Sequence, residues 1–455
     1  MELSDARYLA RVIADISNAP LATNIIEAAK LCFLDYLASS FAGARSEVAI
    51  SGLATLMAYG EGNSTILSHE KTSSLLGSAY FHGLIATVED LDDAHRFASG
   101  LHMSATTFPV AMALGEKLSS SGEAFFKAVV SGYEISSRLC RAADAGLRER
   151  GFHSTGAVGP FGACAVACSL LKLDEDRTTH ALGIAASGTG GLFAFLQEGS
   201  SVRHVHAAWA STNGLQAALM AEQSILGPEK VFEGEDGYFN AYTTGYNADF
   251  IRKSLPSQSQ EFEISNAYHK IYHACGHAIP VITGLLDVRK DLLERVDDIQ
   301  EINIRAYKGS AALTNATPST FEEAKFSLPV ITALTILHGN ISDRELRVDI
   351  RNQEDVKKLA QKVNLSEDAK IHQAFPKLRS TEFDIIFSNG EKITKYVDAP
   401  IGMPENPVSW NQIEQKFRNA SKSYLTGKRQ DQIITHLIEL TKKPSISNTV
   451  KSLRK

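Results

Sequence analysis

Three segments of the chain consist largely of Gly, Ala, Ser and Cys at helical spacing, and they limit the folds that the chain can adopt. Residues 157–173 read AVGPFGACAVACSLLKL, residues 180–196 read HALGIAASGTGGLFAFL, and residues 207–222 read AAWASTNGLQAALMAE. Helices with small side chains on their faces can pack closely against one another. These segments are therefore predicted to form the centre of a helical bundle, and the pattern of the first ~260 residues is helical throughout.

The pattern changes between residues 266 and 403. EINIRAY at 301–307 alternates in period two, and FDIIFSNGEKITKYV at 383–397 contains Asn389-Gly390, a strong hairpin turn. FEEAKFSLPVITALTILHG and EDVKKLAQKVNL, which lie between them, are predicted as helices, and the chain is helical again after Pro404. The sequence thus predicts a mostly α protein: a large all-helical domain (1–265, completed by 404–455) and a smaller α+β lid domain (266–403) with an antiparallel sheet.

Length and charge exclude several classes of protein. A chain of 455 residues is too long for one compact core, which favours two domains. The net charge of -6 argues against nucleic-acid binding, which needs clustered Lys and Arg. We find no signal peptide, and no apolar run approaches the ~20 residues of a membrane helix. Five cysteines without a CxxC motif favour neither disulfides nor a zinc site, so the cytoplasm is the predicted compartment.

Ionisable residues gather in the segment EDLDDAHRFASGLHMS, residues 89–104. Further groups recur beside the small-residue helices, and they include His153, Arg203 with His206, and Lys270. One hypothesis is acid–base catalysis without a metal: a base abstracts a proton α to a carboxylate, and cations hold the developing negative charge. The alternative for each single histidine is structural hydrogen bonding, which is the default for buried polar groups.

A metal site is the second chemical alternative. Asp92, Asp93, His95 and His102 are possible ligands, and His269, His273 and His277 follow one another at i, i+4 spacing. HEXXH is absent, however, and nothing in the sequence fixes a coordination geometry.

The ordered set of motifs resembles the MmgE/PrpD superfamily, which includes 2-methylcitrate dehydratase, cis-aconitate decarboxylase and iminodisuccinate epimerase. EDLDDAH with His102, GFHSTGAVGPFGACAVACSLLKLDED, ALGIAASGTGGLFAFLQEGSSVRHVHAAWASTNGL and FEEAKFSLPVITAL carry the resemblance over nearly the whole chain. The resemblance implies a helical domain with an α+β lid, a homodimer, and no metal or organic cofactor.

The resemblance also implies site residues. The catalytic candidates are Asp90, Asp93, His102, His153 and Lys270. The candidates for substrate binding are Arg203, His95, His206, Cys275 and His277. In this scheme Arg203 and Lys270 hold carboxylates, His102 and His153 act as base and acid, and Asp90 or Asp93 orients a histidine or contacts substrate.

Several positions depart from the family pattern. A Thr is replaced by Ala94, a Lys by Arg203, a His by Cys275 and a Tyr by Val330, and Thr87 stands where a His is common. Arg can hold a carboxylate bidentately but is a poor base, because it stays protonated.

The sequence predicts a cofactor-independent lyase that acts on a small di- or tricarboxylate, with dehydration first. Decarboxylation or epimerisation is the alternative within the family. A metal-dependent hydrolase, or an inactive family member that serves as a binding protein, are the alternatives from other classes.

Overall fold

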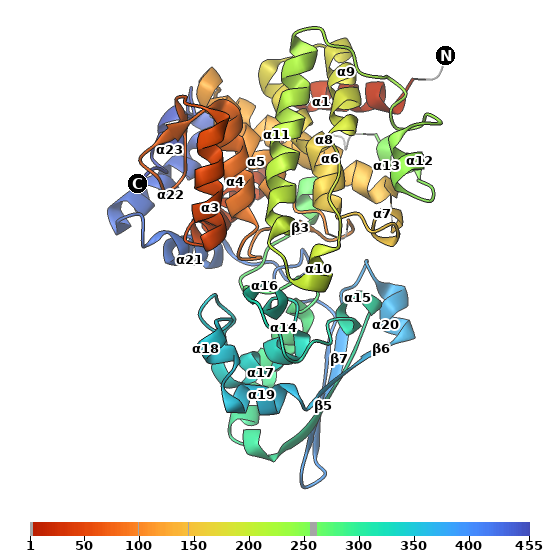
Figure 1. Ribbon diagram of the computed structural model, residues 1–455, viewed down its shortest axis with the longest axis vertical. Coiled ribbons are helices and arrows are strands. Elements are labelled where there is room, and N and C mark those ends of the chain that lie inside the picture. The colour runs from red at the N-terminus through yellow and green to blue at the C-terminus, as the bar shows by residue number, and fades with distance from the viewer. Residues whose placement is uncertain (1–2, 99, 144, 255–261) are drawn as a thin grey trace.

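The structure is a computed structural model and describes residues 3–98, 100–143, 145–254 and 262–455. Helices from both ends of the chain form one part of the molecule, and the segment between them forms a smaller part that contains the main sheet (Figure 1). The chain thus leaves the helical part, builds the sheet-containing part and returns, so the C-terminal helices lie with the N-terminal ones (Figure 1).

The helical part consists of sixteen helices among the described residues. They are α1 (Asp5–Asn18), α2 (Thr23–Gly43), α3 (Glu47–Leu56), α4 (Leu75–Ala86), α5 (Ser104–Leu118), α6 (Gly122–Ala143), α7 (Gly146–Glu149), α8 (Ser154–Leu171), α9 (Glu175–Ser187), α10 (Phe195–Glu198), α11 (Val202–Glu222), α12 (Tyr238–Tyr242), α13 (Ala248–Ile251), α21 (Trp410–Ser421), α22 (Gly427–Ile438) and α23 (Ser447–Lys451). Two-residue strands β1 (Ser64–Thr65) and β2 (Thr72–Ser73) pair with each other, and β3 (Ala94–His95) pairs with β4 (Ala267–Tyr268).

Helices α8 and α11 pack closely at the centre of the helical part, as the small residues predict. A Cβ atom on Gly214 would lie 2.3 Å from the Pro160 carbonyl oxygen, so no larger residue fits there without a shift. Of the described helices, α8 alone is long and apolar enough to span a bilayer, and nearly all its residues are buried inside the protein. It is therefore the core helix of a folded domain.

The lid domain combines a four-stranded sheet with short helices. The helices are α14 (Ile279–Leu293), α15 (Lys308–Ala311), α16 (Phe321–Ala324), α17 (Leu328–His338), α18 (Val348–Arg351), α19 (Glu354–Ala360) and α20 (Ala369–Ala374). The strands are β5 (Ile299–Ala306), β6 (Val363–Glu367), β7 (Thr381–Phe387) and β8 (Lys392–Val397), in the order β6-β5-β7-β8. The 3₁₀ turns of the chain span Met57–Tyr59, Glu263–Asn266, Val296–Asp298 and Leu440–Lys442.

The sheet is mixed. Strands β5, β7 and β8 are antiparallel as predicted, and the β7–β8 hairpin turns at Gly390, whose φ of 84° suits glycine. Strand β6 pairs with β5 in parallel, with Ile302 opposite Val363. The segment that ends the predicted helix EDVKKLAQKVNL is therefore a strand: α19 ends at Ala360, and Val363 and Leu365 pack from β6 against the lid domain core. The mostly α fold with a smaller α+β part is confirmed.

Two separate hydrophobic cores underlie the two parts. One includes buried side chains from Ala6 to Ala267 and from Val408 to Leu453, and the other draws on side chains from Ala274 to Phe387. The bounds of the folding units, at 265/266 and 403/404, stay a prediction, since a core identifies packing rather than a chain boundary.

Candidate active site

The β3–β4 pair brings together the two loops that carry the predicted site residues. Ala94 lies opposite Tyr268 in the antiparallel register, so the loop before β3 and the loop after β4 run beside each other. The first loop carries Asp90, and the second begins with His269 and Lys270. Residues 180 positions apart in the sequence therefore meet between the helical part and the lid domain.

Asp90 sits in a strained turn directly after α4. Its φ is 52°, in the left-handed region that non-glycine residues rarely adopt, and its backbone N–H donates to the Thr87 carbonyl at 3.3 Å. Asp is one of the residues that tolerate this conformation best, and residues held in it cluster at functional sites. The turn points a buried carboxylate toward the lid domain loop.

Two buried cations share the Asp90 carboxylate. Arg203, at the start of α11, donates to Asp90 Oδ2 at 3.0 Å and to the Thr87 carbonyl at 2.9 Å. Lys270 Nζ donates to Asp90 Oδ1 and lies 3.7 Å from Asp92 Oδ1. All three side chains are at most 3% exposed as residues.

These pairings set the charge states of the cluster. Burial raises the pKa of Asp90, but Arg203 and Lys270 outweigh it and hold that pKa well below its ordinary value. Burial likewise lowers the pKa of Lys270, and the nearby Asp90 and Asp92 carboxylates more than reverse that shift. The cluster is therefore fully ionised near neutral pH, with two cations paired to one carboxylate.

His102 is oriented by two acceptors. Its Nδ1 lies 2.9 Å from Asp92 Oδ2 and 3.0 Å from the Asp93 carbonyl oxygen. Because both neighbours only accept, Nδ1 must carry the hydrogen, and in the neutral ring Nε2 is left with a free lone pair. His102 thus has the tautomer of a general base. The sequence assigned the orienting role to Asp90 or Asp93; in the structure Asp92 is the carboxylate in that place.

His153 and His206 form a second histidine pair. Their Nδ1 atoms are 3.1 Å apart, so one donates and the other accepts. Burial is the main cause of the lowered pKa of both rings, and it brings that of His206 to about 4. The His153 ring is 6.4 Å from the His102 ring, between centroids, and packs edge-on against Phe193 and Phe195. Both histidines are therefore neutral near pH 7 and border the cluster.

Two predicted site residues have structural contacts instead. Asp93 accepts from the Tyr133 hydroxyl at 2.6 Å and from the Ser104 N–H at 3.1 Å, and burial raises its pKa. The ring of His95 accepts at Nδ1 from two backbone N–H groups, and its Nε2 donates to Glu263 at 2.9 Å. Each nitrogen of that ring has a partner within the protein, so His95 organises the loop.

The remaining candidates lie in the loop after Lys270. Cys275 is buried, and burial raises the pKa of its thiol to about 11, so it stays uncharged. His277 is half-buried and its Nδ1 lies 2.8 Å from the Tyr307 hydroxyl. Val330, in α17, is buried in the lid domain core and offers no polar group.

Lys416, whose side chain is 7% exposed, is a residue that the sequence reasoning missed. From α21 its Nζ donates to Asp35 Oδ1 at 2.6 Å, to the Leu91 carbonyl at 2.6 Å and to the Lys270 carbonyl at 2.8 Å. Lys416 therefore links the backbone of the loop before β3 to the backbone of the loop after β4. The sequence gives no signal for this role of Lys416. The residue lies in an amphipathic helix, and its backbone partners are distant in the chain.

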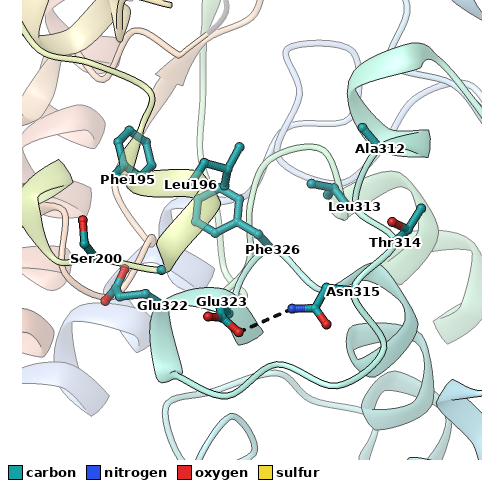
Figure 2. Close-up of a pocket in the computed structure, with 11 residues that line it drawn as sticks. Phe195, Leu196, Ser200, Ala312, Leu313, Thr314, Asn315, Glu322, Glu323 and Phe326 are labelled. Carbon is teal, nitrogen blue, oxygen red and sulfur yellow. Dashed lines mark hydrogen bonds between the residues drawn. The ribbon is translucent and has the colours of Figure 1, made fainter.

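A pocket of about 160 Å³ borders the cluster between the two domains. Figure 2 shows residues from α10 and the segment after it facing residues from the lid domain, with Leu196 and Phe326 near the centre of the view. Phe326 lies under the Arg203 guanidinium, 5.7 Å from its ring centroid, and Glu322 and Glu323 also line the pocket. The carboxylates make this pocket a poor match for an anion, so the buried cation cluster is the better candidate for binding carboxylates.

No ligand set for a metal is evident in the described part of the chain, where no three His, Cys, Asp or Glu side chains converge as metal ligands do. The metal-dependent hydrolase alternative therefore lacks a site among these residues.

The sequence matches the MmgE/PrpD N-terminal domain over residues 7–251 and the MmgE/PrpD C-terminal domain over residues 272–440. The chain belongs to the MmgE/PrpD family, and the resemblance drawn from the motifs is confirmed.

Curated relatives cover nearly the same length. A cis-aconitate decarboxylase-like protein of Aspergillus oryzae is 24% identical over 96% of this chain and 94% of its own. The cis-aconitate decarboxylase of Aspergillus terreus is 25% identical over 95% of this chain and 92% of its own, and that of Homo sapiens is 26% identical over 88% and 85%. With the family, these relatives identify the chain as an enzyme, and the reactions named for them are those of lyases.

Proposed function

We propose that the protein is a cofactor-independent lyase of small polycarboxylates that decarboxylates an unsaturated acid of the cis-aconitate kind. The names of the relatives support decarboxylation over dehydration, which the sequence alone placed first. The identity of about a quarter leaves the substrate itself to be measured.

One observation carries the proposal: two buried cations, Arg203 and Lys270, share the carboxylate of Asp90. Charge-assisted hydrogen bonds of this kind are the strong ones, and burial increases their strength. A substrate carboxylate offers the same oxygen atoms as Asp90 and can take over some of these contacts. Two cations at one place then orient an acid that carries several carboxylates.

His102 supplies the proton transfer in this scheme. In the reaction, the bond between an allylic carbon and its carboxylate breaks, and carbon dioxide leaves. The electron pair of that bond forms a shifted double bond, and the far carbon of the original double bond takes one proton. His102, held at Nδ1 beside Asp92, can take up a proton at Nε2 and deliver it to that carbon. Arg203 and Lys270 stabilise the negative charge that spreads over the remaining carboxylates.

Dehydration uses the same groups differently. His102 would remove a proton α to a carboxylate, and the leaving hydroxyl would need a proton from a second group such as the His153–His206 pair. The neutral state of that pair near pH 7 makes it a weak acid, which favours decarboxylation.

Proton NMR in deuterium oxide tests the proposal. Enzyme dialysed against a strong chelator is incubated with cis-aconitate, 2-methylcitrate and a panel of other di- and tricarboxylic acids. We expect loss of carbon dioxide from an unsaturated acid, with one deuterium in each product molecule. A His102→Asn variant keeps a donor toward Asp92 but has no base, and we expect it to lose roughly a hundredfold or more in kcat. If no acid in the panel is turned over or bound, the chain is an inactive binding protein and the proposal fails.

We also propose that the protein is a cytoplasmic homodimer without nucleic-acid or membrane partners, as the resemblance and composition imply. Sedimentation analysis of the purified chain measures the oligomeric state directly, and a monomer at micromolar concentration would contradict this part.

A further inference from the structure

The turn at residues 87–90 is bound along its main chain as well as at its last side chain. The Val88 carbonyl oxygen accepts a hydrogen bond from Lys325 Nζ at 2.6 Å. Glu89, the next residue, has a carboxylate oxygen 3.0 Å from His273 Nδ1. Both partners belong to the part of the chain that follows β4, so the shape of this turn depends on contacts from outside the helical part.

Lys325 directly follows α16, in the segment FEEAKFSLPVITAL that carries part of the family resemblance. Figure 1 shows α16 at the edge of the lid domain that meets the helical part. The residue is 0% exposed, and its ammonium group donates both to the Val88 carbonyl and to Glu322, at 2.8 Å. Its own carbonyl oxygen accepts from the Cys275 N–H at 3.0 Å. Lys325 therefore connects the loop before β3 and the loop after β4 to the lid domain.

Glu322 balances the charge of this buried ammonium group. Burial raises the pKa of Glu322, but Lys325 and His204 outweigh that effect and bring the pKa to about 2. His204 Nε2 lies 3.2 Å from Glu322 Oε1, and its Nδ1 lies 3.0 Å from the Thr87 hydroxyl. The ion pair of Glu322 and Lys325 therefore reaches the turn at two points, at Thr87 through His204 and at Val88 directly.

The turn requires this support because its backbone is strained. Asp90 has a φ of 52°, and a residue in that region persists only where the surrounding structure fixes it. The hydrogen bond from its N–H to the Thr87 carbonyl is long, at 3.3 Å, and the same carbonyl also accepts from Arg203. A buried carbonyl without a donor destabilises a fold, and Lys325 supplies the donor to Val88.

We propose that Lys325 is a positioning residue, which holds the 87–90 turn so that the Asp90 carboxylate meets Arg203 and Lys270. The cation cluster is then complete only when the lid domain is docked on the helical part. The inference rests on the proposed function in one respect, because the cluster is taken to bind the carboxylates of the substrate. Lys325 itself contacts no substrate in this scheme and acts through the Val88 carbonyl.

Two variants isolate the contact with Val88. The double variant Glu322→Gln/Lys325→Met removes the donor to Val88 together with both charges of the ion pair, so no buried carboxylate is left without its partner. Glu322→Gln alone keeps that donor, and the two variants therefore differ only at Lys325. Lys362→Met is the matched control, because Lys362 Nζ also donates to a main-chain carbonyl, that of Ile299, but within the lid domain.

Hydrogen–deuterium exchange of the protein without ligand measures the turn directly. We expect the amides of residues 88–94 to exchange roughly tenfold faster in the double variant than in Glu322→Gln, Lys362→Met or the wild type. The amides of α8 and α14 should exchange at wild-type rates in all of them. In calorimetry, the double variant should bind tricarballylate, an unreactive tricarboxylic acid, roughly tenfold more weakly than Glu322→Gln does. A merely structural role would not change this affinity in a protein with a normal Tm.

Unchanged exchange of residues 88–94 in the double variant would overturn the positioning role and leave the proposed function standing. Faster exchange throughout both domains with a lower Tm would also overturn it, since Lys325 would then stabilise the whole fold rather than the turn. Equal affinity of the double variant and Glu322→Gln for tricarballylate would overturn the link between the turn and the cluster. Failure of the wild type to bind any acid, with the local change in exchange present, would instead overturn the proposed function and support the role of Lys325 in shaping the turn.

Discussion

Lys416 and Lys270 are two lysines whose side chains are almost fully covered, and they differ in what their ammonium groups contact. All three donors of Lys416 are used, by Asp35 and by the carbonyls of Leu91 and Lys270. Burial is the dominant influence on this group and lowers its pKa. Main-chain carbonyls cannot leave their places without moving the loops, so two of the three contacts of Lys416 cannot be replaced by a ligand.

Lys270 has carboxylates as its partners instead. It contacts Asp90 and lies near Asp92, and together these charges raise its pKa above the ordinary value in spite of burial. Carboxylate contacts can be exchanged for those of another carboxylate at little cost. Burial and ion pairing alone therefore do not distinguish the two lysines; the acceptors of their ammonium groups do.

The largest expected effect is the loss of stability in Lys416→Met. The substitution leaves Asp35 with His269 at 3.4 Å as its remaining ionisable neighbour and removes the donor to two carbonyls. Breaking a buried pair in this way costs about 3–5 kcal/mol. We expect that loss in the free energy of unfolding from urea titrations. Lys422→Met, at an exposed position at the end of α21, is the control and should unfold like the wild type. A Lys416→Met protein within ~1 kcal/mol of the wild type would break the comparison.

The same substitution at Lys270 should act on catalysis more than on stability. Asp90 keeps its hydrogen bond to Arg203 in Lys270→Met, so no carboxylate is left wholly unpaired. Losing a charge-assisted contact of ~1.5–3 kcal/mol lowers kcat/KM by roughly ten- to hundredfold. Steady-state kinetics and unfolding are measured on one preparation. A normal kcat/KM with a strongly reduced Tm would mean that Lys270 is structural like Lys416.

The smallest expected effect concerns pH and the His153–His206 pair. The folded-state pKa of His206 is about 4, below the ordinary 6.5, so between these values the unfolded chain binds more protons than the folded one. The free energy of unfolding must therefore decrease as pH falls from 6.5 to about 4. We expect His206→Asn to reduce this slope and the exposed His372→Asn to leave it unchanged. Equal slopes in the wild type and His206→Asn would show that His206 is not held neutral by the fold.

Much of the fold could be predicted because its signals are local. Glycines and alanines at helical spacing predicted the packed α8 and α11, and Asn389-Gly390 predicted the β7–β8 hairpin. Strand β6 was missed because Val363 and Leu365 continue a helical pattern until the partner strand β5, some sixty residues earlier, is known. A parallel pairing has no turn signal of its own in the sequence.

Part of the candidate site could also be predicted from local signals in the sequence. Asp90, His102, Arg203 and Lys270 lie in motifs that the sequence displays, and the structure brings them together. Whether Asp92 or Asp93 orients His102 depends on the backbone conformation of a short turn. The spacing of residues in the sequence does not determine that conformation. Lys416 was not found, because it acts through partners that lie far away in the chain.

A crystal structure of the enzyme with tricarballylate tests the central claim most directly. We expect carboxylates of the ligand within about 3.2 Å of Arg203 and Lys270, and the ligand carbons beside His102 Nε2. A ligand seated instead in the pocket beside Phe326 and Glu322, with the Asp90 contacts to both cations unchanged, would contradict it.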